Sequence, residues 1–375
     1  MVAVRPALEG RNCLEARYGT GRTRWPPVSV AVQVGLHAAP YHGGGRTPTQ
    51  PRRHGDGADA ARTTSSCPVP PPAVCPLAVY SGYSEQDLAV FDRFRDIRRE
   101  PESGSITNFL GVRMRTEFVS GCEHLDGKVL GLPVPDDGWH SEAIEWIGLL
   151  KSVLSARGRW VSMELGAGWG PWSAAAAAAA RHLGIEDVKL YAVEADPGHY
   201  QFLLRHMHDN GIDPAAHRLI QAAAGPEAGK ARWPKVHDPA GDWGSRPMEV
   251  VGQDGQDHIG RHFEDWLDVD IVAIGDLLAE QPLWDLVHID VQGWEASLCE
   301  AAIESMNAKV RYVVAGTHDA KLHGDLMDLF FRHGWVLENE KPPRFAWQHG
   351  AKSLVAMTSH DGTQVWRNPA LSSPA

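Results

Sequence analysis

The chain has 375 residues, of which 43% are hydrophobic and 22% charged, enough apolar material for one large or two smaller domains. Its net charge is −11, but residues 1–80 hold nine Arg, no Lys and four acidic residues, which leaves 27 basic and 43 acidic residues in the remainder. So acidic a remainder disfavours general nucleic-acid binding, which needs cationic side chains. The sequence has no run of about 18 apolar residues, so we expect no membrane-spanning helix.

Residues 1–80 differ from the rest in composition. They contain 11 of the 26 prolines and lack helix or strand periodicity. We predict a disordered tail or a translated upstream segment; an organellar transit peptide is an alternative, although no amphipathic helix supports it. Only Cys122 and Cys299 follow residue 80, which gives neither a disulfide framework nor a zinc-ligand spacing and favours a cytoplasmic protein.

Order is expected from about Ser84, a predicted N-cap for a helix with apolar residues on one face. Residues 106–118 alternate well enough for one or two strands around Gly111, and residues 140–156 predict a further helix with a buried stripe. We expect residues 81–158 to form a lead-in and a substrate cover.

From residue 159 to 368 the pattern alternates between strand and helix. Helices are predicted at 172–183, 199–210, 295–306 and 320–333, and strands at 160–165, 188–195, 217–224, 285–291, 310–318, 335–340 and 353–359. This alternation predicts an α/β fold with a mainly parallel seven-stranded sheet and helices on both faces. The last two strands are expected to form an antiparallel hairpin at one edge, and about 40 residues after Ala224 an irregular insertion.

The first strand of this region ends in a glycine loop, MELGAGWG, followed by Pro171 and a helix. Gly166, Gly168 and Gly170 allow a sharp turn and close approach to a ligand, next to the positive end of the helix. Ala167 lies between them and is included in the candidate site. The alternative is a tight turn that binds nothing.

Two acidic residues accompany this loop. Glu164 precedes the first glycine by two residues, where it could accept from an amino group, and Glu194 ends the next strand, followed by Ala195. A carboxylate at Glu194 can accept both hydroxyls of a ribose, although it could instead be a charge at a helix N-terminus. S-adenosylmethionine explains this set better than NAD, because Pro171 stands where a dinucleotide fingerprint needs its third glycine.

A second constellation lies at the ends of two later strands. Asp290 follows a buried strand and His318 ends the next one, so both should face the crevice that contains the glycine loop. Either could remove a proton from a methyl acceptor, or could instead fix a loop or lie beside a helix cap. His288, within the strand, is expected in the core, and no histidine spacing indicates a metal, so no metal is predicted.

The order MELGAGWG, YAVEADP, DLVHIDVQGWEASL and GTQVWRN resembles the FkbM-type family of S-adenosylmethionine-dependent methyltransferases over residues 156–368. The resemblance implies a class I methyltransferase fold and O-methylation of glycans or small secondary metabolites. It also implies that the glycine loop with Glu164 holds the methionine end of the cofactor, that Glu194 holds the ribose, and that Asp290, Gly293 and Glu295 lie near the acceptor. Trp294 and the AGTH strand end depart from the family pattern.

Three other functions remain open from the sequence. An NAD(P)-dependent oxidoreductase and a non-catalytic adenosyl-ligand-binding module would use the same architecture. Amino-methylation of nucleobases is less favoured, because DVQG replaces the N/D-P-P-Y/F loop that this chemistry needs. We therefore expect a small-molecule or glycan acceptor and no nucleic-acid or membrane partner.

Overall fold

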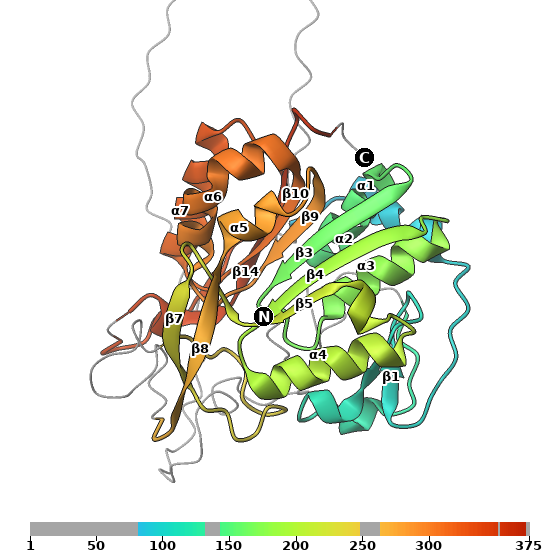
Figure 1. Cartoon of the computed structure of the whole chain (residues 1–375), viewed down its shortest axis with the longest axis horizontal. Helices are drawn as coiled ribbons and strands as arrows, with labels where there is room; N and C mark the ends of the chain where they lie inside the picture. Colours follow the sequence, from blue (N-terminus) through green and yellow to red (C-terminus); the bar gives the residue numbers. More distant parts are fainter. Residues whose placement is uncertain (1–81, 132–142, 248–262, 352, 373–375) are drawn as a thin grey trace, which may run out of the picture. The chain divides into compact units, whose positions relative to one another are not determined.

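The computed structural model describes residues 82–131, 143–247, 263–351 and 353–372. The prediction for residues 1–80 lies outside them. Helices cover both faces of a seven-stranded sheet, as Figure 1 shows.

The sheet has the order β11-β14-β10-β9-β3-β4-β5. Its strands are β3 (Arg159–Leu165), β4 (Asp187–Glu194), β5 (Arg218–Gln221), β9 (Trp284–Ile289), β10 (Val310–Thr317), β11 (Val336–Lys341) and β14 (Gly362–Arg367). The neighbouring pairs from β10 to β5 are parallel, whereas β14 is antiparallel to both β10 and β11. The α/β fold class predicted from the sequence is therefore confirmed.

The helices divide between the two faces of the sheet. One face packs against α2 (Ala143–Ser155), α3 (Pro171–His182) and α4 (Pro197–Asp209), and the other against α5 (Ile274–Ala279), α6 (Glu295–Lys309) and α7 (Ala320–Arg332). Aspartates begin two of them: Asp196 accepts from the backbone N–H of Gly198 and His199, and Asp319 from that of Leu322. These caps fix where α4 and α7 begin, immediately after strands of the sheet.

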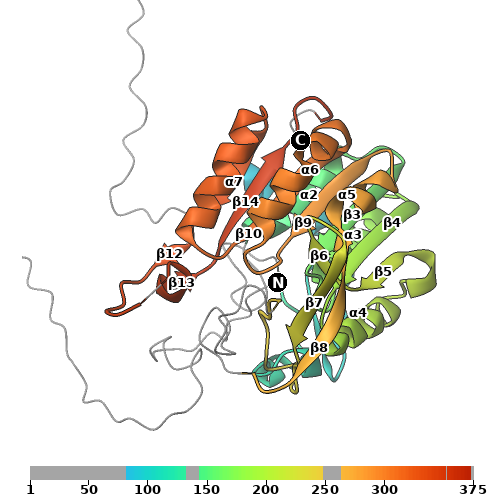
Figure 2. The same ribbon diagram turned by 60° about the vertical axis from the view of Figure 1, so that its left-hand side comes forward.

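The seventh strand is not the one predicted. Residues 353–359 were expected to pair with 335–340, but they form a 3₁₀ helix (Val355–Met357) and the start of β13 (Thr358–His360). β13 pairs with β12 (Arg344–Phe345) in a separate two-stranded sheet, visible beyond the main sheet in Figure 2. The strand that enters the main sheet is β14, whose six residues are all buried because it lies between β10 and β11.

The expected irregular insertion contains a second sheet. β6 (Ala223–Gly225), β8 (Trp266–Ala273) and β7 (Gly229–Pro234) form a three-stranded sheet in the order β6-β8-β7. The predicted strand 217–224 is thus divided between β5 in the main sheet and β6 in this one. The small sheet lies at the carboxyl ends of β4 and β5, where β6 contacts β4.

The lead-in contains the helix and strands predicted for it, whereas its role as a substrate cover stays a prediction. Ser84 caps α1 (Glu85–Leu88), which continues as a 3₁₀ helix (Ala89–Phe94). β1 (Ser105–Thr107) and β2 (Arg113–Arg115) form an antiparallel pair, followed by short 3₁₀ helices at Thr116–Phe118 and Glu123–Leu125. No helix in the described ranges combines the length and apolar character needed to cross a bilayer.

Candidate functional site

The glycine loop lies between the ends of β4 and β9. Gly166 has a φ of 75°, and a Cβ at this position would lie 2.0 Å from the backbone oxygen of Asp290. The N–H groups of Gly166 and Ala167 both donate to the carbonyl of Val193. Glycine is therefore required at 166, because any side chain would displace the loop from the strand end that bears Asp290.

The other two glycines serve packing. Gly170 is the N-cap of α3 with a φ of 73°, and a Cβ there would lie 2.3 Å from Cδ1 of Leu203 in α4. Gly168 has a φ of 58°, and Trp243 from the insertion packs against it. These glycines let α4 and the insertion approach the loop closely.

Glu194 holds the glycine loop and borders the cavity. Its Oε2 accepts from the N–H of Gly168 at 2.7 Å, and its Oε1 accepts from that of Asp196 at 2.8 Å. The side chain is buried, with His199 Nδ1 3.8 Å from Oε1. Because each carboxylate oxygen has two lone pairs, each retains one for a hydroxyl donor. The geometry suits the ribose role predicted for Glu194.

Glu164 lies near the end of β3, and its side chain contacts the start of α3. Its carboxylate accepts from the N–H groups of Trp172, at 3.2 Å, and Ser173, at 2.8 Å, and from the hydroxyl of Ser173. Burial raises the pKa of Glu164 to about 7, against the lowering effect of these hydrogen bonds. These contacts provide acceptors for the first free N–H groups of α3. Contact between Glu164 and a cofactor amino group stays a prediction.

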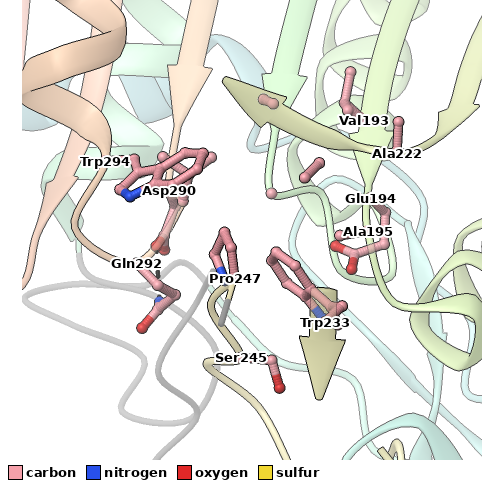
Figure 3. Close-up of a pocket in the computed structure, with 14 residues that line it drawn as sticks. Val193, Glu194, Ala195, Ala222, Trp233, Ser245, Pro247, Asp290, Gln292 and Trp294 are labelled. Carbon is pink, nitrogen blue, oxygen red and sulfur yellow. Dashed lines mark hydrogen bonds between the residues drawn. The ribbon is translucent and has the colours of Figure 1, made fainter. Parts of the chain in front are cut away.

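A cavity opens between Glu194 and Asp290, with an empty volume of about 420 Å³ when its open mouth is counted. Its walls come from the ends of β3, β4 and β9, from β6 and from the insertion: Gly166, Val193, Glu194, Ala195, Ala222, Ala223, Ala224, Trp233, Ser245, Pro247, Asp290, Val291, Gln292 and Trp294. Figure 3 shows Glu194 and Ala195 on one side and Asp290, Gln292 and Trp294 on the other. Of the predicted cofactor residues, Gly166, Glu194 and Ala195 therefore line the cavity.

Asp290 and His318 are in contact, and of the two only Asp290 is among the residues that line the cavity. His318 Nε2 lies 3.1 Å from Oδ1 of Asp290 and 3.0 Å from Oε1 of Glu295, and its Nδ1 lies 3.7 Å from Asp361. Asp290, Glu295 and His318 are all buried. Glu295 also accepts from the N–H of Gly293 at 2.8 Å, which fixes the loop between β9 and α6.

These carboxylates determine the charge of His318. Burial would lower its pKa, but Glu295 and Asp361 raise it to about 9. Burial likewise acts to raise the pKa of Glu295, yet His318 keeps it below its ordinary value. At neutral pH the cluster therefore contains an imidazolium ion, which cannot act as a base until it loses its proton.

The same cluster bears on metal binding. One donor atom from each of Asp290, Glu295 and His318 lies within 4.8 Å of the others, which is close enough to share an ion. Spacing along the sequence could not reveal this group, because three separate positions are joined only by the fold. The imidazolium already supplies a cation between the two carboxylates, so the absence of a metal stays our prediction.

The sequence did not single out Trp233, Ser245 or Asp361. Trp233 and Ser245 are buried, and within the described residues neither the indole Nε1 nor the Oγ has a hydrogen-bond partner. Both line the cavity, as unsatisfied polar groups at a ligand site often do. The high tryptophan count was the only signal for Trp233. His288 lies in the core, as predicted, stacked on Trp172 at 5.1 Å between ring centroids.

Comparison with known proteins gives one substantial match. No family model matches the chain. It is 29% identical to a protein of Jannaschia sp. (strain CCS1) named "Putative methyltransferase", over 72% of this chain and 95% of that protein. The fold is that of the class I methyltransferases. This relative and the cavity together support S-adenosylmethionine as the cofactor and methyl transfer as the reaction.

Solved structures give weaker similarity. A precorrin-6Y C5,15-methyltransferase from Geobacter metallireducens is 12% identical, with a TM-score of 0.33, over 63% of this chain and 89% of that one. The methyltransferase FkbM from Methylobacillus flagellatus is 13% identical, with a TM-score of 0.34, over 56% of this chain and 44% of that one. At these values the fold assignment rests on the strand order itself.

Proposed function

We propose that this protein is an S-adenosylmethionine-dependent O-methyltransferase that acts on a hydroxyl group of a small metabolite or glycan. The observation that carries the proposal is the placement of two buried carboxylates, Glu194 and Asp290, on opposite sides of one cavity beside a glycine loop. The carboxylate of Glu194 is suited to accept hydrogen bonds from ribose hydroxyls, and that of Asp290 to accept the proton of an acceptor hydroxyl.

The residues around the cavity fit this cofactor. Gly166 has no side chain at the point where the loop meets Asp290. The alanines at 222–224 line the cavity with small side chains that leave room for a ligand. Glu194 would hold the ribose hydroxyls through the lone pairs that the backbone N–H groups leave. The sulfonium supplies an activated methyl group, so the protein needs chiefly to align the acceptor and remove its proton.

Asp290 is the proposed base for that proton. It is buried and lines the cavity, whereas His318, with a pKa raised to about 9, is protonated at neutral pH. Oδ1 of Asp290 lies 3.1 Å from Nε2 of His318, so the carboxylate lies beside a buried cation at the edge of the cavity. Aromatic faces at Trp233 and Trp294 suit flat or sugar-like acceptors.

The test is transfer of a labelled methyl group from S-adenosylmethionine into fractionated cell extract by the full chain. We expect label in a methyl ether, which survives mild alkali, and a rate at least 100-fold lower for Asp290→Asn, the scale of losing a general base. Asp290→Asn should still bind S-adenosylhomocysteine. Label on carbon or nitrogen would contradict O-methylation, and NADH binding without S-adenosylhomocysteine binding would favour an oxidoreductase.

A further inference from the structure

Gln292 has an unusual backbone conformation. Within the described residues it is the one non-glycine residue with a positive φ, at 61°. A side chain with a Cβ is unfavourable in this left-handed region, where glycine is the ordinary choice. Such strain persists only where the surrounding structure imposes it, and it occurs most often at functional sites.

The loop around Gln292 explains how this strain is imposed. Glu295 accepts hydrogen bonds from the N–H groups of Val291, at 2.9 Å, and Gly293, at 2.8 Å. Both neighbours of Gln292 are therefore tied to one buried carboxylate, and Gln292 must reverse the chain between them. Glycine at this position would satisfy the same backbone at lower cost, so the presence of glutamine calls for a reason that lies in its side chain.

That side chain contacts Asp290. The amide Nε2 of Gln292 donates to Oδ1 of Asp290 at 3.1 Å, and both residues line the cavity. His318 Nε2 lies 3.1 Å from the same oxygen. Two donors on one oxygen fix the rotation of the carboxylate about its Cβ–Cγ bond and thereby set the direction of Oδ2. Figure 3 shows the carbonyl oxygen of the Gln292 amide pointing away from Asp290.

The insertion encloses the other end of the amide. A Cβ on Gly244 would lie 3.3 Å from Oε1 of Gln292, and Gly244 itself has a φ of 92°. The amide therefore lies between Asp290 and Gly244, where a residue with a side chain would crowd it. Its one hydrogen bond to Asp290 is suited to orienting that carboxylate.

We propose that Gln292 is a positioning residue that orients the Asp290 carboxylate toward the acceptor, and that the strained backbone is retained for this purpose. The inference rests on the proposed function, because orientation of Asp290 matters only if Asp290 receives the acceptor proton. Gln292 does not replace Glu194 in cofactor binding, so cofactor affinity and methyl transfer should respond differently to its substitution.

Two variants and one control test the proposal in the full chain. Gln292→Gly removes the strain and the amide, Gln292→Met keeps the strain and approximate size without the amide, and Gln201→Gly makes the same change at an exposed position in α4. We expect Gln292→Gly to melt roughly 2–3 °C above Gln292→Met, because both lack the amide and only Met keeps the strain, and Gln201→Gly to melt below the wild type by a similar amount. Both Gln292 variants should bind S-adenosylhomocysteine within twofold of the wild type by calorimetry.

The rate of methyl transfer from labelled S-adenosylmethionine to the extract fraction that contains the acceptor should fall at least tenfold in both Gln292 variants. A positioning role lowers the maximal rate of methyl transfer. It leaves unchanged the amount of acceptor fraction that gives half of that rate. Wild-type rates in either variant, or a melting temperature of Gln292→Gly no higher than that of Gln292→Met, would overturn the proposal. If the wild-type protein does not bind S-adenosylhomocysteine, the proposed function is wrong, and this inference is wrong with it.

Discussion

The two sides of the cavity hold their carboxylates in different ways. On the glycine-loop side, Glu164 and Glu194 accept mainly from backbone N–H groups of the loop and of the following helices. On the opposite side, an ionisable side chain makes the closer contacts, because His318 lies within 3.1 Å of both Asp290 and Glu295, whereas His199 stays 3.8 Å from Glu194. Backbone donors cannot lose their proton as the pH changes, whereas His318 can. The first arrangement is suited to holding a ligand, and the second to chemistry that moves protons.

Removal of the imidazolium should have the largest effect. His318→Asn leaves the buried Asp290 and Glu295 carboxylates without their cation, which should lower the free energy of unfolding by about 3–5 kcal/mol. The matched change His208→Asn, at a side chain that is 86% exposed, should have little effect. Urea unfolding followed by circular dichroism measures both. Equal midpoints for the two variants would show that the cluster needs no cation.

A methyl group added to the glycine loop tests how closely the two sides approach. Gly184→Ala adds only the cost of a positive φ, roughly 1–2 kcal/mol, because no atom lies within 4 Å of the new Cβ. Gly166→Ala has nearly the same φ but meets the Asp290 backbone, so it should cost a further 1–3 kcal/mol or so. Thermal unfolding compares the two. If the costs match, the loop is not held against β9.

Truncation of Glu194 tests the glycine-loop side alone. Glu194→Ala should weaken S-adenosylhomocysteine binding by about 1–3 kcal/mol, the scale of a lost hydrogen bond to a charged group. The control is Glu186→Ala, at an exposed position before β4, which should leave affinity unchanged. Isothermal titration calorimetry gives both affinities. Unchanged binding in Glu194→Ala would remove this residue from the cofactor site.

Stability should also depend on alkaline pH, and this dependence should originate on the side of the cavity that bears Asp290. Because the pKa of His318 is raised from 6.5 to about 9, the folded state binds this proton more tightly than the unfolded chain does. Its contribution to stability is complete below pH 6.5 and is lost as the pH rises through about 9. Urea midpoints at pH 6.5, 7.5 and 9 should fall in the wild type and fall less in His318→Asn. Parallel slopes would contradict the assignment.

Local sequence pattern predicted the parallel core of the sheet because each of its strands is a short apolar run bounded by turns. It also placed Glu194 and Asp290 at the edge that borders the cavity, since the carboxyl ends of parallel strands share one edge, whereas His318 lies beside Asp290 and is not among the residues that line the cavity. The final strand was missed because the apolar residues of 353–359 resemble a strand as strongly as those of β14 do. Only the pairing of β14 with both β10 and β11 distinguishes them.

The parts of the site that were missed depend on contacts between distant segments. Trp233 reaches the cavity from β7 of the β6-β8-β7 sheet, whose strand β8 was not anticipated, and Ser245 reaches it from the loop that follows β7. The role of Glu164 at the start of α3 depends on how the helix returns to the strand. Asp361 lies 43 residues after His318 in the sequence, so no local motif could connect the two.

The most direct test of the account is a crystal structure of the full chain with S-adenosylhomocysteine. We predict that both ribose hydroxyls donate to the carboxylate of Glu194 and that the thioether sulfur faces the side of the cavity that bears Asp290. A ligand whose ribose contacts other side chains, or whose sulfur points away from Asp290, would contradict the assignment of the two sides.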